Sequence, residues 1–143
     1  MPLRAATLTL PPHPRGVHLV HGALLDGVRA AGMPLDATAA GLLHLHLLHT
    51  SAGLFLTENA SPDVRRDLDA WMRDVVPDGW PGFRHTLEGP DDMPAHVGSA
   101  LVGVQLALPV EDGRLVLGRW QGIALAEFRE DGGARRVRAT LQH

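Results

Sequence analysis

The segment 85–96, with the sequence HTLEGPDDMPAH, concentrates residues that bind metals or transfer protons. It holds two histidines and three carboxylates, together with two prolines and a glycine. Three neutral imidazoles with one open position form a catalytic zinc site. His49 could supply the third imidazole, because it lies at the end of a predicted strand, where binding sites are usually built. We therefore predict that His49, His85 and His96 bind one divalent metal, with zinc as the expected ion.

A second pair of histidines offers an alternative metal site. His44 and His46 are two residues apart on a predicted strand, so their side chains point the same way and can hold one ion. The simpler interpretation is an exposed strand face without a ligand. The remaining histidines lie in turns, on a short strand or at the end of the sequence, where a solvated ring is expected: His13, His18, His21 and His143.

Carboxylates and arginines suggest further roles. Glu58 ends a strand of apolar character. Asp91 and Asp92 are adjacent and point in different directions, so one is expected to cap the following helix and the other to support a histidine ligand or hold magnesium. Arg136 and Arg138 share one face of the last predicted strand, which would suit a phosphate. The alternative is a charged edge strand that resists aggregation.

The composition limits the classes of protein to which the chain can belong. Its 143 residues are 45% hydrophobic and 20% charged, which predicts one folded domain over residues 1–143. A formal net charge of −3 gives no electrostatic reason to expect a nucleic-acid partner. The sequence has no cysteine, which excludes disulfides and thiolate chemistry, and no apolar run long enough to span a membrane. We expect a cytoplasmic protein without a membrane partner.

The elements that must position these residues follow from hydrophobic periodicity and turn signals. Strands are predicted at 4–11, 16–20, 41–50 and 53–59, and helices at 22–32, 61–77 and from about 92 to 103. In the middle helix Ser61 is the expected N-cap, and the expected buried stripe consists of Val64, Leu68, Met72 and Val75. The segment 78–90 has the composition of a loop.

In the C-terminal third the sequence predicts strands at 104–110, 114–129 and 135–142 that are joined by hairpins. Asp-Gly turns occur at 112–113 and 131–132, between segments in which apolar and polar residues alternate. Antiparallel strands that follow helices in this way are typical of an α+β protein. We expect a mainly antiparallel sheet that curls into a sandwich or a partly open barrel, covered by about three helices.

Several blocks together resemble one protein family over essentially the whole chain. They are HTSAGLFLTENASPDVRRDL, EGPDDMPAHVGSALVG, GRLVLGRWQGIALAEFR and GGARRVRATL. The chain resembles the YjbQ family, also called the UPF0047 or secondary thiamine-phosphate synthase family. The pattern EG-x-DDMP-x-H, which spans 88–96, is its most specific block.

The resemblance implies a trimer with weak thiamine-phosphate synthase activity and an unsettled physiological role. In that reaction a pyrimidine methyl diphosphate is joined to a thiazole phosphate, and pyrophosphate is released. The implied site combines the metal ligands named above with candidate catalytic residues Glu58, Asp92 and Ser51. The implied residues for the phosphorylated substrate are Arg135, Arg136, Thr50, Asn59 and Gln121. The motif also includes Glu88, Asp91 and Trp120.

Two other functions remain open. A metal-dependent hydrolase of a small phosphorylated metabolite would use the metal to activate water, with Glu58 or Asp92 as the base. A non-catalytic trimer could instead bind a small anion or a metal. For the synthase, magnesium is the alternative metal because it commonly accompanies diphosphates.

Overall fold

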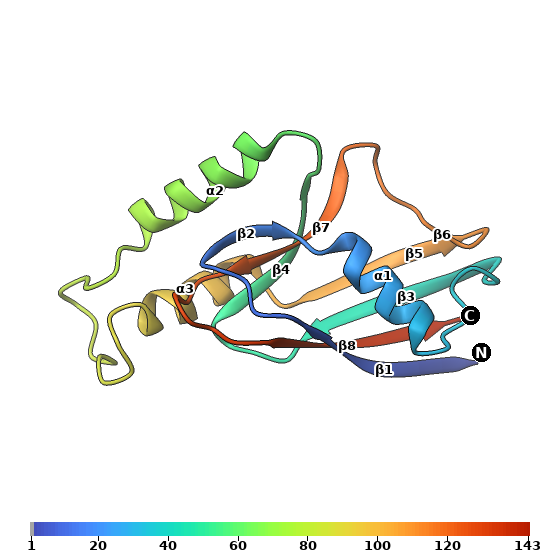
Figure 1. Cartoon of the computed structure of the whole chain (residues 1–143), viewed down its shortest axis with the longest axis horizontal. Coiled ribbons are helices and arrows are strands. Elements are labelled where there is room, and N and C mark those ends of the chain that lie inside the picture. Colours follow the sequence, from blue (N-terminus) through green and yellow to red (C-terminus); the bar gives the residue numbers. More distant parts are fainter. Residues whose placement is uncertain (1) are drawn as a thin grey trace.

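The computed structural model describes residues 2–143, and within that range it contains two antiparallel sheets and three helices (Figure 1). The five-stranded sheet has the order β1-β8-β3-β5-β6. Its strands are β1 (Leu3–Leu10), β8 (Arg135–Gln142), β3 (Ala40–Leu47), β5 (Gln105–Glu111) and β6 (Arg114–Leu115). The three-stranded sheet has the order β2-β7-β4, with β2 (Gly16–Leu19), β7 (Gln121–Glu127) and β4 (Ala52–Glu58). The predicted α+β class and the two-sheet arrangement are confirmed, and the sheets do not close into a barrel.

The main core lies between the two sheets and is completed by helix α1 (His21–Ala30). Strict alternation along β3 and β8 sends every second residue into this core, including Leu43, Leu45 and Leu141. Ile123 of β7 enters from the other sheet, and Leu24 enters from α1. The opposite face of the five-stranded sheet therefore carries the polar residues of the same strands.

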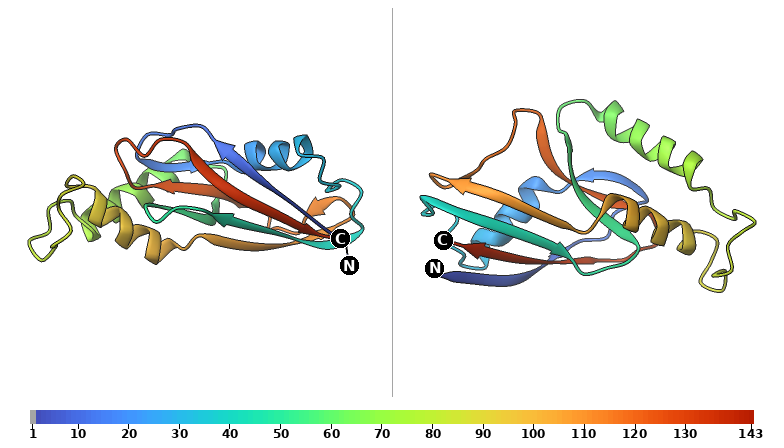
Figure 2. Two further views of the ribbon diagram at one scale, coloured as in Figure 1. Left: turned by 90° about the horizontal axis from the view of Figure 1, so that it is seen from below. Right: turned by 180° about the vertical axis from the view of Figure 1, so that it is seen from behind.

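Helices α2 (Pro62–Val75) and α3 (Asp92–Val102) form an outer layer on the three-stranded sheet. Strand β7 is buried along nearly its whole length because the core covers one face and α3 covers the other. Figure 1 shows α2 in green and α3 in yellow-brown at one end of the molecule. The views in Figure 2 show that the loop joining them projects at the end away from the two termini. No helix among residues 2–143 is long and apolar enough to cross a bilayer.

The two Asp-Gly turns have different outcomes. The first one closes the β5–β6 hairpin, where Asp112 and Gly113 both take positive φ angles, 48° and 76°. The second prediction is wrong, because β7 pairs with β2 and β4 whereas β8 pairs with β1 and β3. The segment 128–134 therefore carries the chain from one sheet to the other. Strand β6 also ends at Leu115, well short of the continuous strand expected after Arg114.

Helix α2 begins and ends where the sequence predicts, but it is less buried than expected. Val64, Leu68 and Met72 are half-buried, and Val75 is 49% exposed. Ser61 occupies the N-cap position without a side-chain capping bond. Instead, the carboxylate of Glu58 accepts hydrogen bonds from the backbone N–H groups of residues 60 and 61, at 3.0 and 2.9 Å, and so fixes the turn that leads into the helix.

Candidate metal centre

Helix geometry brings an acid and a histidine of the EG-x-DDMP-x-H block together. Asp92 is the first residue of α3 and His96 lies four residues later, so both side chains project from the same face of the helix. His85, at the end of the loop that precedes α3, folds back onto the same carboxylate. The structure therefore gathers three of the predicted site residues at the N-terminal end of α3.

The cluster of His85, Asp92 and His96 has the geometry of a metal-binding group. One ligand atom from each residue lies within 4.8 Å of the other two. The Oδ2 atom of Asp92 is 2.6 Å from Nε2 of His85 and 3.1 Å from Nε2 of His96. Asp92 is 5% exposed, whereas the side chains of His85 and His96 are 46% and 32% exposed. Two imidazoles and one carboxylate form a known catalytic zinc set.

The hydrogen bonds of His96 determine which of its nitrogens is free. Its Nδ1 atom lies 2.8 Å from the carbonyl oxygen of Thr50, and a carbonyl can only accept, so Nδ1 carries a proton. In the neutral ring Nε2 then presents a lone pair toward the carboxylate oxygen of Asp92. Two lone pairs that face each other at 3.1 Å repel each other unless a proton or a metal cation lies between them. A backbone carbonyl that orients the other nitrogen is typical of metal-ligating histidines.

Arg129, at the start of the crossing between the sheets, holds both acids of the block. It donates from Nη1 to Oδ1 of Asp92 at 2.5 Å and from Nε to Oδ2 of Asp91 at 3.1 Å. It also donates to the carbonyl oxygen of Glu88 at 3.1 Å. Sequence reasoning did not identify Arg129, because nothing in the spacing says which arginine faces the two acids.

Both acids are held in the ionised form. The pKa of Asp92 is lowered mainly by its hydrogen bond with His85, with the positive charge of Arg129 contributing, although burial opposes the shift. At Asp91 burial raises the pKa, but the backbone N–H of Glu130 and the guanidinium of Arg129 outweigh it, so the net shift is again downward. The prediction that one of these two acids caps α3 is wrong: Asp91 occupies the N-cap position, but its carboxylate binds these groups and makes no cap bond to the helix.

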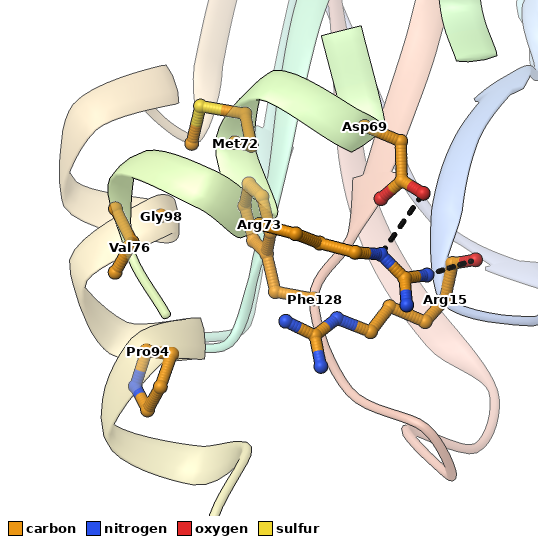
Figure 3. A pocket seen from close by; sticks show the side chains of 8 residues that line it. All are labelled: Arg15, Asp69, Met72, Arg73, Val76, Pro94, Gly98 and Phe128. Carbon is orange, nitrogen blue, oxygen red and sulfur yellow. Dashed lines mark hydrogen bonds and ion pairs between the residues drawn. The ribbon is translucent and has the colours of Figure 1, made fainter. Parts of the chain in front are cut away.

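Close backbone approaches hold α3 in its place. At Gly98 an added Cβ atom would lie 2.8 Å from the ring of Phe128, and at Gly53 of β4 it would lie 2.5 Å from Val102. Figure 3 shows Phe128 and Gly98 beside Met72 and Val76, where α2, α3 and the crossing meet. Arg15 reaches this junction and pairs with Asp78 of the projecting loop at 2.7 Å. The loop that carries His85 is thereby anchored near its beginning.

His49 lies outside the three-residue cluster but lines a depression that reaches it. The depression has a volume of about 640 Å³ and is lined by residues that include His49, Thr50 and His96. The Nε2 atom of His49 accepts a hydrogen bond from the backbone N–H of Arg136 at 2.7 Å, so its proton is on Nδ1. Burial lowers its pKa, with help from the neighbouring arginines, so the neutral ring is favoured. A ligand role for His49 would require that hydrogen bond to break, and that role stays a prediction.

Ser51 and Arg135 belong to a buried ion-pair network. Arg135, 4% exposed, pairs with the carboxylate of Glu127, 1% exposed, at 2.7 and 2.6 Å. Its Nη1 atom also donates to the hydroxyl oxygen of Ser51 at 2.9 Å. These contacts occupy the guanidinium and the hydroxyl, which favours a structural role for both residues. Arg136, by contrast, is exposed, and the backbone of its strand fixes its direction.

Another group of motif residues lies at the far end of the three-stranded sheet. Glu58 pairs with Gln121 in the β4–β7 register, whereas Ala52 pairs with Glu127 at the metal end. Seven residues of β4 span roughly 20 Å at about 3.3 Å per residue. Asn59 joins this far group and donates to the carbonyl oxygens of residues 119 and 121, at 3.4 Å each. Trp120 also lies there, 54% exposed beneath the guanidinium of Arg119.

The His44–His46 pair lies on the polar face of the five-stranded sheet. The ring centroids are 6.3 Å apart, and Nε2 of His44 lies 3.2 Å from the side-chain oxygen of Gln105. Arg138 is the cross-strand neighbour of His46. An adjacent cation opposes a second cation, so this face is a poorer metal site than the cluster at α3.

Comparison with protein families gives one match over almost the whole chain. The sequence model of the family described as UPF0047 protein YjbQ-like matches residues 6–143. A UPF0047 protein YjbQ from Salmonella typhimurium is 50% identical over 136 residues, which cover 95% of each chain. The protein of the same name from Escherichia coli O157:H7 is 48% identical with the same coverage.

Solved structures show the same fold. A conserved hypothetical protein from Thermus thermophilus has a TM-score of 0.79 and 37% identity, and the match covers 96% of this chain and 99% of that one. A YbjQ-like protein of unknown function from Sulfolobus solfataricus has a TM-score of 0.82, with 99% of both chains covered. At 18% identity this second likeness supports the fold alone.

Proposed function

The chain belongs to the UPF0047 YjbQ-like family, and from that premise we propose that it is a metal-dependent enzyme that acts on small phosphorylated metabolites. The specific reaction that we propose is a thiamine-phosphate synthase-like transfer. The resemblance to the family suggests this reaction, and the chemistry of the cluster at α3 is compatible with it. Zinc is the expected metal, with magnesium as the alternative when a diphosphate is bound.

One observation carries the metal proposal: Nε2 of His96 faces Oδ2 of Asp92 at 3.1 Å while its Nδ1 is hydrogen-bonded to a carbonyl. Two ligands of a tetrahedral zinc ion lie about 3.3 Å apart when each is about 2.0–2.1 Å from the metal. The His96–Asp92 separation is close to that value. The 2.6 Å contact between His85 and Asp92 would have to widen by about 0.7 Å to reach that separation, which an exposed loop residue can accommodate. The donor set therefore fits the ion.

In the proposed transfer the residues around the cluster bind the phosphates, and the substrates supply the reacting atoms. The carbon–oxygen bond between the pyrimidine methylene and the diphosphate breaks, its electron pair leaves with pyrophosphate, and the thiazole nitrogen supplies the pair for the new carbon–nitrogen bond. A bound divalent cation would neutralise charge on the departing phosphates. Arg136 and the Nδ1–H of His49 are the donors that we assign to a phosphate group. No protein nucleophile is required, which suits a chain without cysteine.

We also propose that the protein is a homotrimer whose site lies at a subunit boundary. Two groups of motif residues lie roughly 20 Å apart at opposite ends of β4, too far to contact one small substrate within a single chain. Exposed apolar side chains support an interface: Leu87, Leu101 and Trp120 are all more than half exposed. Light scattering at micromolar concentration should give three times the chain mass, and a monomer mass would exclude this arrangement.

The function is tested by assay of the protein after metal content has been measured. The metal-loaded protein is incubated with the pyrimidine diphosphate, with and without the thiazole phosphate, and pyrophosphate and thiamine phosphate are measured. Formation of thiamine phosphate, lost in Asp92→Asn and retained in Asp36→Asn, supports the transferase. Asp36 is a matched control because it is exposed and pairs with Arg29 far from the cluster. Pyrophosphate release that needs no thiazole phosphate would identify a hydrolase. If neither thiamine phosphate nor pyrophosphate forms, the remaining function is that of a binding protein.

A further inference from the structure

A second, smaller hollow adjoins the metal cluster through His85. It has a volume of about 220 Å³ and lies within the projecting loop and the first turn of α3. His85 lines this hollow, whereas His96 lines the larger depression, and the two ring centroids are 5.3 Å apart. Both histidines contact the same oxygen of Asp92. The cluster therefore lies where two separate hollows approach each other.

The walls of the smaller hollow are aromatic and apolar. Trp80 and Phe83 meet edge to face, with ring centroids 5.2 Å apart and an interplanar angle of 64°. Met93 of α3 lines the same hollow, and two prolines of the loop complete its apolar wall, Pro81 and Pro90. Trp80 is 52% exposed although it is large and apolar, so part of its surface is available to a ligand. Aromatic faces and a thioether are partners that a planar ring prefers.

We propose that this hollow binds the planar aromatic or heteroaromatic ring of a substrate and places the atom that reacts beside His85. The inference rests on the proposed function, because it concerns the same site, and it assigns Trp80, Phe83 and Met93 as the residues that select the ring. The volume lies below the range for drug-sized ligands, so the hollow holds one substituted ring while the rest of the molecule reaches the metal cluster.

Polar groups at the rim are suited to a heterocycle. Nε2 of His85 contacts Asp92, which leaves Nδ1 on the accessible edge of the ring. The hydroxyl of Thr86, also part of the lining, can both donate and accept. The nearby acids Asp91 and Asp92 share one guanidinium, that of Arg129, which compensates only one of their two negative charges. An uncharged ring with nitrogen or amino substituents matches these surroundings better than an anion does.

Two hollows that meet at one cluster favour a reaction between two molecules. A hydrolase needs one organic substrate and water, whereas a group transfer needs a donor and an acceptor close together. The aromatic hollow would hold the ring of one reactant, and the depression beside His49 and Thr50 would hold the other reactant. Two adjoining hollows therefore favour the group transfer over the hydrolase.

The test measures ring binding to the zinc-loaded protein without any turnover. 4-Aminopyrimidine is titrated by protein-observed NMR, with cyclohexanol as an aliphatic probe of similar size. The variants are Trp80→Leu and Phe83→Leu, which remain apolar but lose an aromatic face. Trp71→Leu is the matched control, since Trp71 is an exposed tryptophan of α2 that does not line the hollow. Thermal melts confirm that each variant is folded.

We expect saturable binding of the pyrimidine, with shifts at residues 79–93, and binding weaker by roughly two- to tenfold in both variants. Trp71→Leu should bind as wild type does, and cyclohexanol should bind less well than the pyrimidine. Equal binding by wild type and both variants, or equal binding of both probes, would overturn the inference. A change of molecular mass in Trp80→Leu with unchanged ring binding would also overturn it, since the hollow would then be a subunit contact. Zinc affinity is measured in parallel, so that failure of the metal proposal is seen separately.

Discussion

The guanidinium of Arg135 and the carboxylate of Glu127 form a two-bond ion pair, at 2.7 and 2.6 Å, that is almost completely buried. Glu127 is the last residue of β7 in the three-stranded sheet, and Arg135 is the first residue of β8 in the five-stranded sheet. The pair therefore clamps the two ends of the crossing 128–134. Arg129, which holds the two acids of the metal centre, lies on that crossing.

Removal of one partner of this pair should destabilise the protein strongly. In Arg135→Met the carboxylate of Glu127 stays buried without a counter-charge, and we expect a loss of about 3–5 kcal/mol in the free energy of unfolding. The double variant with Glu127→Gln should recover part of that loss, because no uncompensated charge remains. Urea unfolding measures both. An unchanged midpoint in Arg135→Met would contradict the buried clamp, and Arg138→Gln, on the exposed face, is the control that should change little.

Arg129 should make the stability depend on pH at the acid end. The pKa values of Asp91 and Asp92 lie below the usual 3.8 in the folded state, so their ionised forms stabilise the protein above that value. This stability is lost as the pH falls through the folded pKa values. Arg129→Gln removes a charged partner of both acids, and we expect about 2 kcal/mol of destabilisation at neutral pH. Melting temperatures measured from pH 7 to pH 2.5 should show the gap between wild type and variant narrowing below about pH 4.

A difference in melting temperature between wild type and Arg129→Gln that stays constant with pH would contradict this role of Arg129. Arg66→Gln provides the comparison, because Arg66 forms an exposed pair with Asp63 within the same helix. An exposed pair of this kind is worth little, so its variant should follow the wild-type curve throughout.

Zinc binding should depend on the cluster at α3 and not on the histidines of the sheet. Asp92→Asn and His96→Gln should each weaken zinc binding by at least tenfold, because each removes one of three ligands. His44→Gln should bind zinc with unchanged affinity. Isothermal titration of the metal-free protein checks all three. Loss of binding in His44→Gln, with retention in His96→Gln, would move the metal site to the outer face of the sheet.

Arg136 should contribute to phosphate binding without affecting the fold. Its side chain is exposed. The hydrogen bond to His49 is donated by the backbone N–H of Arg136, which a glutamine at this position would keep. A charge-assisted contact is worth on the order of 1.5–3 kcal/mol, so Arg136→Gln should weaken pyrophosphate binding by roughly ten- to a hundredfold. Calorimetric titration of pyrophosphate, together with matched thermal melts, tests this. Equal affinities would mean that Arg136 belongs to a solvated strand and does not contact the ligand.

Much of the fold follows from local patterns that tertiary contacts did not override. Alternation along residues 41–50 predicts a strand with its leucines on one face, and the structure has a strand at Ala40–Leu47 with Leu43, Leu45 and Leu47 buried. The hairpin predicted at 131–132 is absent, because an Asp-Gly sequence favours a tight turn but does not determine which strands pair. There the buried Glu127 and Arg135 favour a crossing between the sheets.

The candidate site was predictable in part. His85, Asp92 and His96 were all singled out, and the spacing of four residues between Asp92 and His96 on a helix is a signal that could have paired them. Asp92 was instead assigned to acid–base chemistry. The role of Arg129 could not be read from the sequence, because it depends on how the crossing between the sheets approaches α3.

The position of β8 has a consequence for how the chain folds. This strand is the last element of the described chain, yet it lies inside the five-stranded sheet, where Leu3 pairs with Gln142 and Leu47 pairs with Val137. The sheet can be completed only after segments about 130 residues apart have met, and loop closure over that distance opposes the meeting until the contacts are made. Domains rich in such distant pairings fold over milliseconds to seconds. The β5–β6 hairpin and the backbone hydrogen bonds within α2 join residues that are close in the sequence, so they can form long before the five-stranded sheet is complete.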